Sequence, residues 1–111
     1  MSKFIWRFHS PRNWRRVYVI AATEAEARTK LHKRHKDYLL SVRPPLPITE
    51  GVYQVKMYAN YSDGSRKSFL LPDMFNSRQK AKDYANDSAF DYQATTYHVS
   101  VTCEVLEVAH V

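Results

Sequence analysis

The chain of 111 residues has one cysteine, two glycines and no long uncharged apolar run. A single cysteine, Cys103, excludes an intramolecular disulfide and a cysteine-rich zinc site. The two glycines, Gly51 and Gly64, cannot form a glycine-rich phosphate-binding loop. The lack of a long apolar run predicts no transmembrane helix, and the first residues predict no signal peptide. We therefore expect a cytoplasmic protein with no membrane partner.

Acidic residues are scarce in the first part of the chain. Residues 1–43 hold eleven Lys and Arg against three Asp and Glu, a balance of +8, whereas residues 44–111 hold six against eight, a balance of −2. A one-sided positive charge raises the local concentration of anions and the rate of association with polyanions. It favours a nucleic acid, a nucleoprotein complex or an acidic protein surface as the partner.

Residues 4–20 predict a β-hairpin with aromatic strands and a basic tip. Phe4, Trp6 and Phe8 share one face of the first strand, because side chains alternate between the two faces with a period of two. This face can enter a core. The other face carries Arg7 and meets solvent or a ligand.

Two helices are predicted from their start signals. Thr23 and Glu26 form a capping box, in which each side chain pairs with a backbone amide left free at the helix start, and it predicts a helix over 24–38. Asn76 is predicted to cap a second helix over 77–90. We expect the first helix to have one apolar face and one basic face.

Three further strands follow from alternating hydrophobicity. The first covers Tyr53–Tyr61 and is joined by the turn residues Asp63 and Gly64 to a second, Arg66–Leu71. Tyr97–Val105 alternates most regularly of all, which predicts a half-buried strand of an antiparallel sheet.

Between the two parts, residues 41–50 contain three prolines and predict a stiff extended connector. The chain length fits one domain over 1–111, with this connector between two β-β-α halves. The order β-β-α-β-β-α-β predicts an α+β fold, with an antiparallel or mixed sheet of about five strands and two helices on one face.

An alternative order leaves out the first strand and gives a ferredoxin-like β-α-β-β-α-β fold with an extra N-terminal strand. In this order Val17, Tyr18 and Val19 resemble the first-strand motif of the RNA-recognition motif family. The resemblance implies that Tyr18 stacks on a base. The strand Arg66–Leu71 departs from the family's second motif, since Phe69 is its one aromatic residue.

Residue patterns typical of catalysis are missing. Cys103 lies on the apolar face of its strand, and His98 and Glu104 are about 20 Å apart along that strand. His32 and His35 have a spacing that could hold a metal, but the surrounding cations oppose it. We therefore predict no metal, no cofactor and no enzymatic activity.

The first functional hypothesis is a non-enzymatic module that contacts nucleic acid or a nucleoprotein complex through the basic, aromatic hairpin and the basic face of the first helix. Arginine can bind phosphate with two hydrogen bonds and can stack on bases. The candidate contact residues are Arg7, Arg12, Trp14, Arg15, Arg16, Lys30, Lys33 and Arg34.

The alternative is a protein-binding adaptor or inhibitor, because the chain has more tyrosines than a small core needs and tyrosine is common at protein interfaces. Small proteins without a catalytic site occur among phage and mobile-element products that block host defence machinery, such as anti-CRISPR proteins. Edge strands could also pair two copies into a homodimer.

Overall fold

A computed structural model of the chain describes residues 2–11, 15–33, 39–40 and 43–110. Over these ranges the elements are, in order, β1 (Phe4–His9), β2 (Arg16–Ala21), α1 (Glu24–His32), β3 (Leu39–Leu40), β4 (Leu46–Pro47), β5 (Gly51–Tyr61), β6 (Arg66–Leu70), α2 (Arg78–Thr95) and β7 (Val99–His110). The predicted α+β class is confirmed.

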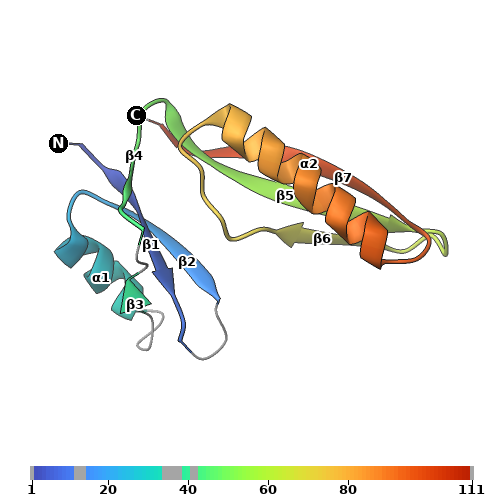
Figure 1. The fold of residues 1–111 in the computed structure, drawn as a ribbon, viewed down its shortest axis with the longest axis horizontal. Helices are drawn as coiled ribbons and strands as arrows, with labels where there is room; N and C mark the ends of the chain where they lie inside the picture. Colours follow the sequence, from blue (N-terminus) through green and yellow to red (C-terminus); the bar gives the residue numbers. More distant parts are fainter. Residues whose placement is uncertain (1, 12–14, 34–38, 41–42, 111) are drawn as a thin grey trace.

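The strands form two sheets, so the prediction of a single sheet with both helices on one face is wrong. One sheet has the order β2-β1-β3, with β4 also paired to β1, and the other has the order β6-β5-β7. Each sheet has its own helix, and the second sheet with α2 extends away from the first like an arm (Figure 1). We call residues 4–47 the N-terminal unit and residues 51–110 the C-terminal unit.

The pairing of β1 also shows why the ferredoxin-like alternative is wrong. β1 and β2 form the predicted hairpin and pair over six residues each, from Phe4 opposite Ala21 to His9 opposite Arg16. β2 therefore lies at the edge of the first sheet and has no place at the centre of a sheet with β5, β6 and β7. The resemblance to the RNA-recognition motif family, which depended on that order, loses its structural basis.

The N-terminal unit is built on the predicted aromatic face of the hairpin. Phe8 is fully buried and packs with Ala27 and Leu31 of α1, and Trp6 packs against this cluster. On the opposite face Ile5 is also fully buried, so that face is not left wholly to solvent as predicted.

The predicted capping box at the start of α1 is confirmed. The Thr23 hydroxyl accepts a hydrogen bond from the Glu26 amide at 3.2 Å, and the Glu26 carboxylate accepts one from the Ala22 amide at 3.0 Å. α1 ends at His32 instead of the predicted Tyr38, and residues 34–38 of that prediction lie outside the described residues.

In the C-terminal unit β5 is the central strand. Tyr53 and Val55 of β5 are buried against Ala81 and Ala85 of α2. The predicted turn between β5 and β6 is confirmed at Gly64, which has a φ of +90°, a value that favours glycine.

The cap of α2 differs from the prediction. Ser77, and not Asn76, is the N-cap, and its hydroxyl accepts a hydrogen bond from the Lys80 amide at 3.4 Å. Asn76 is buried and donates instead to the carbonyl of Pro47 at 2.9 Å. This contact joins the proline-rich connector, which forms the short strand β4, to the start of α2.

The chain between β6 and α2 passes close to the N-terminal unit. In this 71–76 segment the backbone of Phe75 pairs with Tyr53 of β5 through two hydrogen bonds of 2.8 Å. Asp73, in the same segment, forms an ion pair with Arg16 of β2 at 3.4 Å. The segment therefore lies beside the edge of the first sheet.

Candidate functional site: a basic cleft along β2

A cleft of about 330 Å³ lies between β2, α1 and the 71–76 segment. Four consecutive residues of β2 contribute to it, because side chains from both faces of an edge strand reach the space beside that edge. We call it the β2 cleft, and its lining residues are Val17, Tyr18, Val19, Ile20, Lys30, Leu31, Lys33 and Met74.

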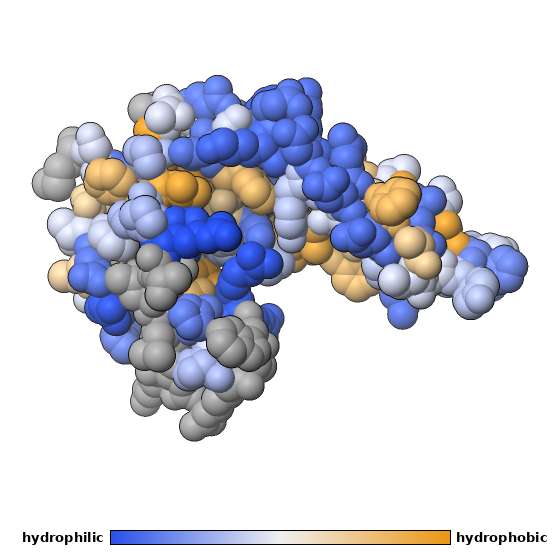
Figure 2. Space-filling model, viewed as in Figure 1, coloured by the Kyte–Doolittle hydropathy of each residue, from blue (hydrophilic) through white to orange (hydrophobic). Residues whose placement is uncertain are grey.

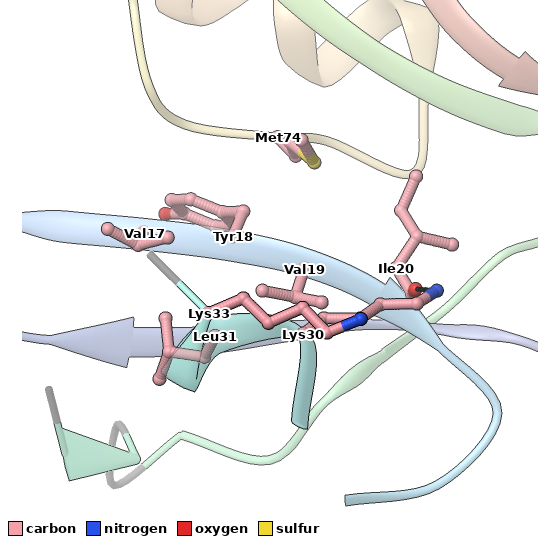
Figure 3. Close-up of a pocket in the computed structure, with 8 residues that line it drawn as sticks. All are labelled: Val17, Tyr18, Val19, Ile20, Lys30, Leu31, Lys33 and Met74. Carbon is pink, nitrogen blue, oxygen red and sulfur yellow. Dashed lines mark hydrogen bonds between the residues drawn. The ribbon is translucent and has the colours of Figure 1, made fainter. Parts of the chain in front are cut away.

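The side chains divide into two groups around β2. Tyr18 and Ile20 lie on the side of Met74, and Val17 and Val19 lie on the side of α1 (Figure 3). The apolar residues form the walls of the cleft. Its positive charge comes from α1.

The two lysines of the cleft are one helical turn apart, so both side chains extend toward β2 (Figure 3). The Lys30 ammonium donates a hydrogen bond to the Ile20 carbonyl at 2.8 Å and lies 3.2 Å from the Glu26 carboxylate. The Ala22 amide, and then Lys30, hold the pKa of Glu26 below its ordinary value, so this carboxylate stays ionised. Lys33 is exposed.

An ionic cluster lies beside Tyr18, where β2 meets the 71–76 segment. The Asp73 side chain is 8% exposed and Arg16 is 59% exposed. Burial raises the pKa of Asp73, while Arg16 and the Tyr18 hydroxyl act in the opposite direction. Burial, together with the charge of Asp73, also raises the pKa of Tyr18 and keeps its hydroxyl neutral.

The structure brings together three of the eight residues predicted to bind the partner. Lys30 and Lys33 line the cleft, and Arg16 lies next to it through Asp73. Arg15 is exposed and directly precedes β2.

The other predicted residues do not contribute to the described cleft. Arg7 donates a hydrogen bond to the Pro44 carbonyl, and burial lowers the pKa of its guanidinium. It therefore joins β1 to the proline-rich connector. Arg12, Trp14 and Arg34 lie outside the described residues.

Sequence reasoning missed Asp73 and Met74. Both are distant in sequence from the hairpin and reach it only because the 71–76 segment pairs with β5. No local pattern marks them. Tyr18 was singled out as a base-stacking residue, but it lies at a sheet edge and not at the centre of an open sheet face.

Two features of the described residues concern metal binding and thiol chemistry. The described residues contain no group of three or more His, Cys, Asp or Glu that could hold a metal ion. Burial raises the pKa of Cys103 in the C-terminal unit, which disfavours its reactive thiolate form. No helix within the described ranges is long and apolar enough to cross a membrane.

No protein-family model matches the chain, and no significant match is found to a curated protein or to a solved structure. The geometry and charge of the β2 cleft therefore carry the functional argument.

Proposed function

We propose that the chain is a non-enzymatic binding module that contacts nucleic acid, free or within a nucleoprotein complex, through the β2 cleft. The observation that carries the proposal is that Lys30 and Lys33 line the same cleft as Tyr18, in the half of the chain with a balance of +8. Ammonium groups attract phosphates, and an aromatic ring in the same cleft offers a base a surface for stacking.

The shape of the cleft favours single strands. Its walls are apolar and its charge lies on one side, along α1. A single strand can place bases against apolar walls while its phosphates meet the lysines, whereas a duplex keeps its bases stacked internally. We expect single-stranded DNA or RNA to bind more tightly than a duplex of equal length.

A salt titration tests this proposal. Fluorescence anisotropy with labelled single-stranded and duplex oligonucleotides gives the affinity at several salt concentrations. If Arg16, Lys30 and Lys33 each neutralise one phosphate, the logarithm of the affinity falls with the logarithm of salt with a slope of about −2 for single strands. Replacing one lysine, as in Lys33→Gln, should reduce the magnitude of this slope by about 0.7.

The matched control is Lys82→Gln, which removes the same charge from an exposed position on α2. It should leave the slope within error of the wild type. Absence of binding at low salt, or an equal loss in the two variants, would contradict the proposal.

A second candidate function is a protein-binding adaptor or inhibitor of the phage or mobile-element type. It is favoured by large apolar side chains on the C-terminal unit, where Phe90 is 73% exposed and Tyr97 is 90% exposed. Exposed aromatic residues often anchor protein interfaces. Stoichiometric capture of a protein from nuclease-treated lysate, retained by Lys33→Gln and lost in a variant with Phe90→Ser and Tyr97→Ser, would favour this function over the first.

A further inference from the structure

The outer strands of the two sheets differ in how well they are protected from pairing with other molecules. On β2, the Ile20 carbonyl already accepts a hydrogen bond from the Lys30 ammonium. β4 has two residues, one of them Pro47, and β6 has five residues and carries Arg66 and Lys67. Lysine, proline and short length all prevent an edge strand from pairing further.

β7 has none of these protections. It is an edge strand of twelve residues, about 40 Å long, and it contains no Lys, Arg or Pro. β5 pairs with it on one side. A groove of about 470 Å³ follows the strand beside α2. Its apolar lining residues are Ala85, Ala89, Val101, Cys103 and Val105, and its polar lining residues are Arg78, Lys82 and Asn86 of α2.

We infer that β7 pairs antiparallel with β7 of a second copy of this chain, which joins the two C-terminal sheets into one sheet of six strands. An antiparallel edge can pair with itself about a two-fold axis. On the face of the arm seen in Figure 2, hydrophobic residues are interspersed with hydrophilic ones.

The residues along β7 are complementary to themselves. With the two-fold axis at Cys103, Val101 of one copy lies opposite Val105 of the other on the helix side. On the other side, Glu104 lies opposite Thr102. Each glutamate therefore meets a neutral residue, and the valines, which favour strands, meet across the joint.

The partner is a second copy because the pattern fits itself in charge and in hydrophobicity. In the groove the apolar residues of β7 lie beside the small alanines Ala85 and Ala89 of α2. The β2 cleft and the β7 edge share no lining residue, so this inference does not depend on the proposed function.

Multi-angle light scattering over a wide range of protein concentration tests the inference. We expect the mass to rise with concentration from 13.0 kDa to twice that value. In hydrogen exchange, the amides of β7 should become more protected at the higher concentrations. A chain that keeps the monomer mass at every concentration would overturn the inference.

Thr102 is the position at which charge can direct the pairing. Thr102→Glu places two pairs of like charges across the joint, one on each side of the axis, and should weaken dimerisation about tenfold or more. Thr102→Lys places lysine opposite Glu104 and should keep or strengthen the dimer.

Ser68→Glu is the matched control. Ser68 and Thr102 are both exposed and lie on either side of Tyr58, one on β6 and one on β7. Ser68→Glu should leave dimerisation unchanged. Equal weakening by Ser68→Glu and Thr102→Glu, with both variants folded by circular dichroism, would overturn the assignment of the interface to β7.

Discussion

The ion pair between Arg16 and Asp73 should respond unequally to the loss of its two members. Asp73 is 8% exposed and one of its carboxylate oxygens, Oδ1, is buried without a hydrogen-bond partner, whereas Arg16 is 59% exposed. An ion pair with an exposed arginine stabilises the folded state by only about 0–1 kcal/mol. A buried carboxylate without its partner is costly, by about 1–3 kcal/mol.

Arg16→Gln should therefore lower the free energy of unfolding by about 1–3 kcal/mol at neutral pH, because it leaves the Asp73 charge without a cation. Asp73→Asn should stay within about 1 kcal/mol of the wild type, since it removes the buried charge together with the pair. Urea unfolding followed by circular dichroism measures both values.

The pH dependence gives a second, independent readout. Burial raises the pKa of Asp73 above its ordinary value of 3.8, so the folded state holds the proton more tightly than the unfolded chain does. Relative to Asp73→Asn, the wild type should gain stability as the pH falls from the raised pKa to 3.8. Above the raised pKa, the cost of the buried charge is fully present.

Asp63→Asn is the matched control, for which the pH dependence of stability should have the opposite sign. Hydrogen bonds from the hydroxyl and the amide of Ser65 lower the pKa of Asp63 below 3.8. Relative to this variant, the wild type should lose stability as the pH falls from 3.8 through the lowered pKa. If the wild type instead loses stability relative to Asp73→Asn on acidification, or if Arg16→Gln is as stable as Asp73→Asn at neutral pH, the reasoning about the buried charge is refuted.

Two further substitutions test the framework of each unit. Leu31→Ala should lower the free energy of unfolding by about 2–5 kcal/mol, because Leu31 is buried and packs α1 against the hairpin. Lys33→Ala, at an exposed position, should change it little. Chemical denaturation compares the two variants. Gly64→Ala should lower the free energy of unfolding by about 1–2 kcal/mol, because residue 64 has a positive φ. Gly64→Asn should lower it less, because asparagine tolerates that conformation. Equal thermal stability of the two variants would contradict a steric origin of the loss.

Local features of the fold were predictable because they depend on neighbours in sequence. The Thr23 cap, the turn at Gly64 and the buried face of Phe8 all follow from spacing of a few residues. Each is decided by backbone geometry or by the period of two along a strand.

The division into two sheets was not predictable in this way. Alternation shows which face of a strand is buried, but not which strand is its neighbour. β1 pairs with β2, β3 and β4 and thereby completes its own sheet, which leaves β5 to pair with β6 and β7. The candidate site depends on the same long-range arrangement. Lys30 and Lys33 could be named from charge alone, whereas Asp73 reaches β2 only through tertiary structure.

The pairing of β5 with β7 sets the order in which the two units can form. Gly51 lies opposite His110, so the most buried strand receives its longest partner only after the chain has been synthesised to the end of β7. The strands of the N-terminal unit, in contrast, all lie before residue 48. Because contacts between distant residues form slowly and the chain is synthesised from the N-terminus, we expect β5 to stay open along one edge after the strands of the N-terminal unit have been made. In the interval before β7 is made, this open edge of β5 can pair with other chains.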